Sequence, residues 1–313
     1  MGWTVEEIPD QNKRVFVVTG ANSGLGLATT RILARHGGHV ILAVRDEEKG
    51  HRAVTEITAR QPDASLEVRR LDLADLDSVR TFAHGLRADH ARLDVLVNNA
   101  GVMAPPRTLS AQGHELQFAA NHLGHFALTG LLLDLLTGGD ARVVTVSSTN
   151  HRQGRIHFDD ITGERGYKPM AFYNQSKFAN AVFGIELHRR LTEAGSPLRS
   201  VLAHPGYTAT NLQTSTPTGL TKLIFGRILS PLAQSPDQGA LPQLYAATAP
   251  VAGGQFIGPD GLAELRGGPT TVRLSPAAAD PETGRRLWHL SEQLTDVRFV
   301  FPTSPGRQSV AGQ

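Results

Sequence analysis

The chain has 313 residues, of which 40% are hydrophobic and 19% charged, as in folded proteins with a substantial core and unlike disordered chains. The 31 basic and 29 acidic residues leave a formal net charge of only +2, and no dense basic block points to nucleic-acid binding. The lack of cysteine excludes disulfides, thiolate catalysis and cysteine-ligated metals.

Strand-like and helix-like patterns alternate along the chain. Short apolar runs predict strands at residues 14–20, 39–44, 65–73, 92–101, 141–148, 198–206 and 253–258. Longer segments between them predict helices at residues 24–36, 46–60, 75–88, about 113–137 and about 170–194. This alternation predicts an α/β fold with one Rossmann-type, doubly wound parallel sheet of about seven strands and helices on both faces.

Apolar segments are too short to suggest a membrane protein. The first 14 residues contain no signal-peptide-like run, and the apolar segment FALTGLLLDLL (126–136) is interrupted by Asp134. Because a membrane-spanning helix needs about 20 apolar residues, this segment is predicted to be a buried helix. We therefore expect a cytoplasmic protein without a membrane anchor.

The segments TGANSGLG, NNAG, SS and HPGYT stand at the carboxyl ends of predicted strands. In parallel sheets ligands bind beyond these ends, so the four segments are expected to gather at one edge. The first segment places glycines between a strand and a helix, where backbone N–H groups can approach a pyrophosphate. Plain strand-to-helix turns also use glycines, but the strand–turn–helix context favours dinucleotide binding. The expected cofactor contacts here are Gly20, Asn22, Ser23, Gly24, Leu25 and Gly26.

The end of the second strand, AVRD, bears on the choice of dinucleotide. Val44 stands where an acid would select NAD, and Arg45 follows it, which favours NADP(H) with NAD(H) as the alternative. Asp46 is also compatible with capping the next helix. Asp72, with Leu73 beside it, could bond the adenine amino group or cap a helix.

Seven segments in order over residues 14–206, namely TGANSGLG, LDL, NNAG, NHLGHF, VSS, YNQSK and HPG, resemble the short-chain dehydrogenase/reductase family. The phrases LAVRDEEKG, NNAGVM, NHLGHFALT and RLWHLSEQLT are most similar to its branch of retinol dehydrogenases and related NADP-preferring reductases, as far as about residue 295. The resemblance implies hydride transfer between a nicotinamide and a carbonyl or secondary alcohol.

The resemblance makes Tyr173 the proton-transfer group and Lys177 its partner, which also binds the nicotinamide ribose. In a helix, positions i and i+4 share a face with a rise of about 6 Å. A cation about 4 Å from the phenol, at an effective dielectric of about 20, contributes about 4 kcal/mol, or about three pKa units. We therefore expect Lys177, helped by an oxidised nicotinamide, to lower the pKa of Tyr173.

Further roles are implied by the same resemblance. Ser148 would hold the substrate oxygen, with Ser147 as the alternative, and Asn121 would order a proton-relay water or, alternatively, satisfy helix backbone as a buried amide. The remaining cofactor contacts are Asn98, Ala100, Gly101, Pro205, Gly206 and Thr208, the last bonding the carboxamide.

Two departures from the family pattern affect what can be carried over. The segment HRQGRIHFDDI (151–161) lengthens the connection between Ser148 and Tyr173, so both a monomer and a homodimer remain open. The membrane anchor of animal retinol dehydrogenases has no counterpart here, which weakens the inference of a retinoid substrate.

The 13 histidines are interpreted as structural, and no catalytic metal is predicted. The histidines weighed as ligands, none with tight spacing to acids, are His36, His39, His122, His125, His151, His157 and His204.

Residues 1–300 are expected to form one dinucleotide-binding and catalytic domain, followed by a flexible tail at 301–313. The Pro- and Thr-rich stretch at about 207–235 is predicted to be a substrate loop or, alternatively, a mobile surface loop. Its apolar residues, which suggest a bulky hydrophobic substrate, are Leu212, Leu220, Leu223, Ile224 and Phe225.

The predicted function is an NADP-dependent carbonyl reductase or alcohol dehydrogenase acting on a small molecule. The alternatives are a catalytically idle dinucleotide sensor or scaffold and a sugar-nucleotide epimerase.

Overall fold

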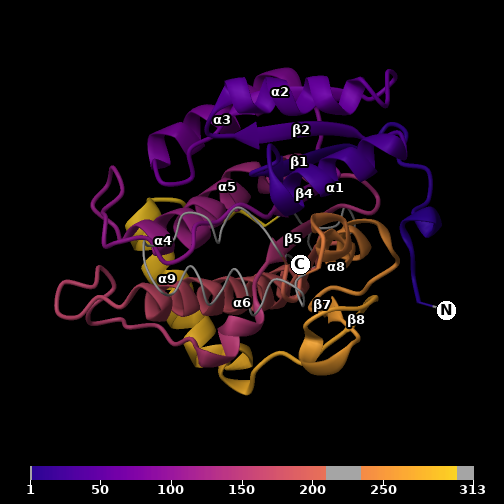
Figure 1. Ribbon diagram of the computed structural model, residues 1–313. Helices are drawn as coiled ribbons and strands as arrows, with labels where there is room; N and C mark the ends of the chain where they lie inside the picture. Colours follow the sequence, from indigo (N-terminus) through magenta and orange to yellow (C-terminus); the bar gives the residue numbers. More distant parts are fainter. Residues whose placement is uncertain (1, 209–233, 302–313) are drawn as a thin grey trace, which may run out of the picture.

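A computed structural model describes residues 2–208 and 234–301, in which a central sheet lies between two layers of helices (Figure 1). The strands are β1 (Val15–Thr19), β2 (His39–Val44), β3 (Leu66–Arg70), β4 (Val95–Asn98), β5 (Arg142–Val146), β6 (Arg199–Ala203), β7 (Phe256–Pro259) and β8 (Pro269–Thr271). The longer helices are α1 (Gly24–Arg35), α2 (Glu47–Thr58), α3 (Leu76–Asp89), α5 (Gly124–Leu132), α6 (Pro169–Glu193), α8 (Pro236–Thr248) and α9 (Pro281–Thr295). Shorter helical segments are η1 (Val5–Glu7), α4 (Leu116–Phe118), η2 (Ala119–Leu123), η3 (Leu133–Leu135), η4 (Thr149–Gln153), η7 (Leu262–Glu264) and η8 (Pro276–Ala279).

The sheet has the strand order β3-β2-β1-β4-β5-β6-β7-β8. All neighbours are parallel except β7 and β8, which are antiparallel. The predicted doubly wound parallel sheet is therefore confirmed. The eighth strand was not expected, because its three residues, two of them exposed, are too few to carry a periodic pattern.

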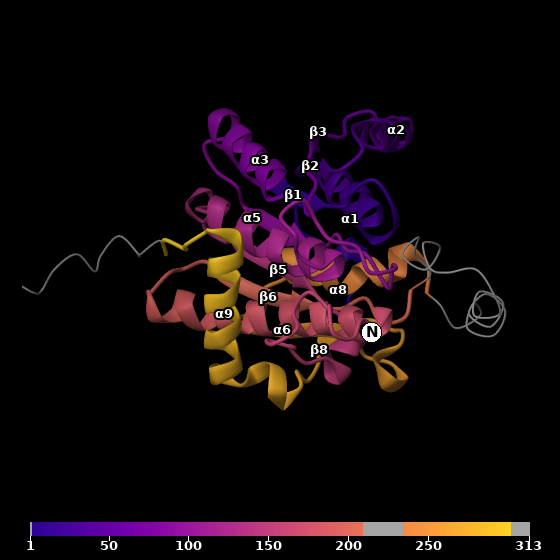
Figure 2. The ribbon, with the colours of Figure 1, turned by 90° about the vertical axis from the view of Figure 1, so that its left-hand side faces the viewer.

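The strands are buried on both faces because each face carries its own helices. Apolar side chains of α3, α5, α6 and α9 pack on one face, and those of α1, α2 and α8 on the other. Helix α9 lies across α6 on the outside of the first layer (Figure 2). This packing fixes the carboxyl ends of the strands as one rigid edge.

The long helix expected at about 113–137 is broken into shorter pieces. The Glu115 carboxylate accepts a hydrogen bond from the backbone N–H of Phe118 at 2.7 Å and so caps α4. The chain then passes through the π-helical turn η2 before α5 begins at Gly124. Such π-helical turns inside helices are often found at functional sites, and this one contains Asn121.

Helices α8 and α9 were not among the expected elements, although each carries a recognisable start. Ser235 and Asp280 are their N-caps, and each is followed at once by proline, which suits the first helical position. In α8 the interior Pro242 weakens the helical pattern.

Among residues 2–208 and 234–301, each helix is too short or too polar to cross a membrane. The predictions for the tail at 302–313 and for the five apolar loop residues between 209 and 233 lie outside the described residues.

Candidate active site

The strand order reverses between β1 and β4, so the carboxyl ends of these two strands flank a crevice. A pocket opens at this place, and its lining comes from the turns that follow β1, β2, β3 and β4. The lining residues are Gly20, Asn22, Ser23, Gly24, Leu25, Gly26, Ala43, Arg45, Asp46, Lys49, Leu71, Asp72, Leu73, Asn99, Ala100, Gly101, Val102 and Ala120. The structure thus brings together the residues expected to contact the pyrophosphate and the adenosine.

The glycine-rich turn after β1 requires glycine at two of its positions. Gly20 has a φ of +66°, which lies in the left-handed region that side chains disfavour. A Cβ at Gly26 would lie 2.3 Å from the carbonyl oxygen of Gly20, closer than any real contact. Helix α1 therefore begins directly against the end of β1, with its free N–H groups at the pocket.

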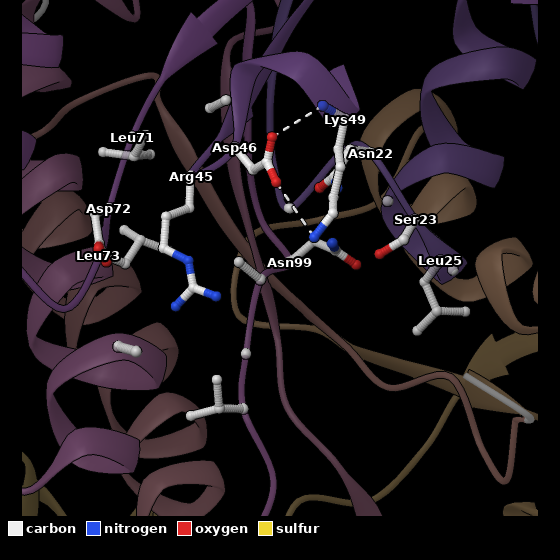
Figure 3. A pocket seen from close by; sticks show the side chains of 18 residues that line it. Asn22, Ser23, Leu25, Arg45, Asp46, Lys49, Leu71, Asp72, Leu73 and Asn99 are labelled. Carbon is white, nitrogen blue, oxygen red and sulfur yellow. Dashed lines mark hydrogen bonds and ion pairs between the residues drawn. The ribbon is translucent and has the colours of Figure 1, made fainter. Parts of the chain in front are cut away.

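Arg45, Asp46 and Lys49 form the wall of the pocket after β2 (Figure 3). Asp46 is the N-cap of α2: it accepts the backbone N–H of Lys49 at 3.0 Å and pairs with the Lys49 ammonium at 3.2 Å. Arg45 makes no hydrogen bond or ion pair with any other described residue. The predicted Asp46 cap is therefore present, and the Arg45 guanidinium is left available to a ligand in the pocket. Lys49 was missed, although its place at the third helical position after an acidic cap puts it beside the cap.

Asp72 and Leu73 reach the pocket because β3 ends at Arg70, three residues earlier than expected. The Asp72 carboxylate accepts the backbone N–H of Ala74 at 3.0 Å, which is the turn-capping role given as its alternative. Only one oxygen of the Asp72 carboxylate accepts this bond, and the other is left for a ligand. Capping of the turn and binding of the adenine amino group are therefore compatible roles for Asp72.

Asn99, not Asn98, lines the pocket. Asn98 is fully buried, and its amide donates to the hydroxyl of Thr129 in α5 at 3.0 Å. Asn99 lies at the pocket, where its amide donates to the carbonyl of Thr19 at 2.7 Å. The expectation for Asn98 is therefore wrong by one residue, because successive side chains at the end of a strand point to opposite faces.

Tyr173 and Lys177 lie one turn apart on α6 and are almost fully buried, with exposed fractions of 8% and 4%. The Lys177 ammonium lies 5.9 Å from the centre of the Tyr173 ring and donates to the carbonyl of Val146 at 3.3 Å. A Cβ at Gly101 would lie only 3.5 Å from the Lys177 nitrogen. Lys177 is therefore next to the pocket wall and also next to Tyr173.

The two serines after β5 have different partners. The Ser147 hydroxyl is buried and donates to the carbonyl of Lys177 at 2.7 Å. Ser148 is the N-cap of η4, accepts the backbone N–H of Asn150 at 3.2 Å and bonds to the Tyr173 side chain. The geometry therefore favours Ser148 over Ser147 as the partner of Tyr173.

Burial governs the protonation of the pair. It raises the pKa of Tyr173 to about 12, although the bond from Ser148 acts in the opposite direction. Burial also lowers the pKa of Lys177 to about 8, so its ammonium loses a proton more readily than that of a lysine in water. The lowering of the Tyr173 pKa expected from Lys177 together with an oxidised nicotinamide stays a prediction, because burial and Ser148 are the groups that shift this pKa here. Near neutral pH Tyr173 is a protonated phenol that can donate.

Asn121 is a buried amide, and the backbone it binds is that of the loop after β4, whereas the alternative given for it expected helix backbone. Its side-chain oxygen accepts the N–H of Val102 at 2.7 Å, and its amide donates to the Val102 carbonyl at 2.9 Å and to the Ser176 hydroxyl at 2.9 Å. These bonds hold the loop after β4 against α6. A role in ordering a relay water stays a prediction.

Pro205, Gly206 and Thr208 follow β6 on the same edge of the sheet. The Thr208 hydroxyl donates to the carbonyl of Pro205 at 3.0 Å, which closes a tight turn. Gly206 has a φ of +66°, and a Cβ there would lie 2.5 Å from the carbonyl of Leu265. Their predicted contacts with a nicotinamide stay predictions.

A network around Glu264, in η7, was missed. Gly206 donates its N–H to Nδ1 of the buried His204 at 3.2 Å, so His204 is the tautomer whose Nε2–H donates to Glu264 at 3.0 Å. The other oxygen of Glu264 accepts from Arg152, at 2.6 Å, in the η4 segment that begins after Ser148. Burial lowers the pKa of His204 to about 4 despite the carboxylate, which keeps the ring neutral. Glu264 therefore ties the Ser148 segment to the Gly206 turn.

The chain matches the model of a known family and several characterised relatives. Residues 14–220 match the family described as short chain dehydrogenase. Retinol dehydrogenase 12 of Bos taurus is 38% identical over 91% of this chain and 87% of its own. Polyprenol dehydrogenase of Mus musculus is 40% identical over 92% of this chain and 85% of its own.

Two crystal structures are similar as well. A protein of uncharacterised function from Mycobacterium paratuberculosis is 46% identical, with a TM-score of 0.81, and the match covers 96% of this chain and all of that one (100%). A short chain dehydrogenase from Escherichia coli CFT073, crystallised with NADPH, is 25% identical, with a TM-score of 0.57, over 76% of this chain and 92% of that one.

Proposed function

The chain belongs to the short-chain dehydrogenase family of NAD(P)-dependent oxidoreductases of CH–OH and C=O groups, and we propose that it is an NADP(H)-dependent carbonyl reductase with Tyr173 as the proton donor. The reverse reaction is the oxidation of the corresponding alcohol. The observation that carries the proposal is the group formed by the buried Tyr173 and Lys177 and the half-buried Ser148, next to the Gly101 wall of the pocket. A protein that only binds a dinucleotide needs no buried proton donor.

The residues of the pocket fit a dinucleotide. The Gly20 turn and the N-terminus of α1 would hold the pyrophosphate, since a side chain at Gly26 would collide with the turn. Asp72 would accept the adenine amino group, and Lys177 would bind the nicotinamide ribose. When bound, the reduced cofactor supplies a hydride to the carbonyl carbon of the substrate.

The preference for NADP(H) over NAD(H) rests on the wall after β2. Arg45 is exposed at the pocket and has no partner among the described residues, so its guanidinium can pair with the additional phosphate. Lys49 adds a second cation, although Asp46 partly neutralises it. The complex of the E. coli relative with NADPH agrees with this preference.

Tyr173 supplies the proton that the reduction consumes. Its phenol is protonated at neutral pH, since the ordinary pKa of tyrosine is already about 10 and burial raises it further, so it can donate to the carbonyl oxygen as negative charge develops there. The Ser148 hydroxyl donates a second hydrogen bond to the same oxygen and so fixes its position beside the phenol. Lys177 favours the tyrosinate that remains.

We further propose that the substrate is bulky and apolar. Two of the relatives are named for retinol and for polyprenol, which are long apolar alcohols. The sequence between Thr208 and Gln234 also contains the five apolar residues that suggest such a substrate.

A panel of ketones, aldehydes and secondary alcohols, followed by nicotinamide absorbance with NADPH and NADH, tests the proposal. We expect at least one bulky apolar carbonyl compound to be reduced, faster with NADPH. If dinucleotide binds but no carbonyl or alcohol in the panel reacts, an idle sensor is the better account. Epimerisation of a sugar nucleotide without net change in NADPH would favour an epimerase.

A further inference from the structure

At the end of the sheet opposite to the cofactor pocket, three potential metal ligands converge from three elements. They are His39 at the start of β2, Glu67 in β3 and His90 at the end of α3. Their ligand atoms all lie within 4.8 Å of one another. We propose that these three side chains bind a divalent transition-metal ion, zinc in the first place, at a site separate from the proposed active site.

The distances fit a tetrahedral ion. Nε2 of His39 lies 3.4 Å from Oε2 of Glu67, and Nε2 of His90 lies 3.1 Å from the same oxygen. Ligand atoms about 2.0 to 2.1 Å from a tetrahedral zinc ion lie about 3.3 to 3.4 Å apart. The ligand atoms of the two histidines lie within 4.8 Å of each other, so the three atoms can share one ion after side-chain adjustment, and water would complete its coordination.

Neighbouring groups orient the ligands as in known metal sites. Nδ1 of His39 lies 2.8 Å from the hydroxyl of Ser65, so it can donate there and leave the Nε2 lone pair facing Glu67. Arg69 binds the other oxygen of Glu67, Oε1, and therefore leaves Oε2 to face the two imidazoles. The exposed fractions of the His39, Glu67 and His90 side chains are 29%, 28% and 16%, so an ion can enter from solvent.

The charge around the site suits a cation in spite of Arg69. The guanidinium also pairs with Asp89 at 2.7 Å, so two carboxylates surround one arginine. The carboxylates of Glu67 and Asp89 thus outnumber the one guanidinium beside them.

The ligand types select the metal. Two imidazole nitrogens and one carboxylate suit zinc, cobalt, nickel and copper, whereas magnesium and calcium prefer sets of oxygen ligands. The interpretation of His39 as structural depends on its spacing to nearby acids, and it does not include the distant residues that the fold brings to it. The partners could not be found by spacing, since Glu67 is 28 residues from His39 and 23 residues from His90.

An ion here would link the edge strand β3 to β2 and to the end of α3. Glu67 lies opposite Ile41 in the β2–β3 ladder, and Ile41 packs in the core under α3. The other end of β3 leads into Leu71, Asp72 and Leu73 of the cofactor pocket. The expected role is therefore to stabilise this edge of the sheet, without a part in the hydride chemistry.

Isothermal titration with Zn²⁺ on the metal-free full chain tests the site, together with thermal unfolding. We expect one high-affinity equivalent and, at a free zinc concentration about 100 times the dissociation constant, a melting temperature higher by about 5 °C. His39→Gln, Glu67→Gln and His90→Gln should each weaken binding at least about ten-fold. Ser65→Ala, which removes only the orienting hydroxyl, should weaken it about ten-fold.

His51→Gln is the matched control, because His51 is exposed on α2 away from the cluster. It should bind zinc as the unmodified chain does. If a strand variant is unfolded without metal, His90→Gln at the helix end decides the question. The proposal is overturned if the unmodified chain binds no zinc, or if the three ligand variants bind it as tightly as His51→Gln does.

Discussion

The two sides of the proposed active site hold their charges in different surroundings. On the adenosine side Arg45 and Lys49 are exposed, and the Lys49 side chain keeps 59% of its surface in water. On the catalytic side Tyr173 and Lys177 are buried, and burial shifts both pKa values. Recognition of a phosphate requires only an available cation, whereas proton transfer requires a phenol held in a fixed position beside the reacting oxygen. Substitutions on the catalytic side should therefore change chemistry, and those on the adenosine side should change affinity.

The largest effect is expected for Tyr173→Phe. Removal of the phenolic proton should lower kcat for an accepted carbonyl by about 10² to 10⁴-fold, because the developing oxyanion then lacks its general acid. The dissociation constant for NADPH should change little, since the ring stays in place. Steady-state kinetics and fluorescence titration measure the two quantities. Tyr245→Phe is the control, because Tyr245 packs against Trp3 in another part of the molecule. Undiminished turnover in Tyr173→Phe would show that the assignment is wrong.

The buried charge of Lys177 should be visible in stability. Its pKa is about 8 in the folded chain and 10.5 as the ordinary value, so both states are protonated below pH 8 and the cost of burying the charge is then fully present. Between pH 8 and 10.5 the folded chain releases the proton first, and stability rises with pH. From pH 7.5 to 10 the unmodified chain should gain about 2 to 3 kcal/mol relative to Lys177→Met, measured by urea unfolding. Parallel pH profiles would contradict the shifted pKa.

Arg45→Ala should affect the adenosine side alone. Loss of the charged contact to the additional phosphate should weaken NADPH binding by about 10 to 100-fold and leave NADH binding within about three-fold. Arg52→Ala is the matched control, because Arg52 is exposed on the following helix, α2, and pairs with Glu48. Equal weakening of both cofactors by Arg45→Ala would rule out the NADP preference.

Glu264→Gln should have the smallest effect and should fall on the catalytic side. The amide can still accept from His204 but loses the charge that holds Arg152, so the Ser148 segment becomes less firmly placed. We expect kcat to fall by about ten-fold, with an unchanged dissociation constant for NADPH. Glu164→Gln, on an exposed side chain, is the control. If Glu264→Gln lost NADPH affinity without a change in kcat, the assignment of Glu264 to the catalytic side would be wrong.

Local patterns predicted most of the adenosine side. The glycine-rich turn, the Asp46 cap and Arg45 each depend on neighbours in the sequence, and the structure places all of them at one pocket. The sheet could be predicted for the same reason, since buried strands and the helices between them have periods that a sequence displays. The error at Asn98 came from the end of a strand, where one residue decides which face a side chain takes.

The catalytic side and the metal cluster depend on contacts between distant segments. Arg152 and Glu264 are 112 residues apart, and no local pattern joins them. The raised pKa of Tyr173 follows from its burial in the folded chain, which sequence spacing cannot reveal. The break at η2 likewise follows from the bonds of Asn121 to Val102 and Ser176.

Transfer of an isotopic label tests the central claim most directly. NADPH carrying deuterium at the transferable position of C4 is mixed with the enzyme and an accepted ketone, and the product alcohol is analysed by mass spectrometry and NMR. The account predicts one deuterium per product molecule, on the former carbonyl carbon, with one NADPH oxidised. Product without deuterium at that carbon, or NADPH oxidation without formation of alcohol, would contradict hydride transfer to a carbonyl group.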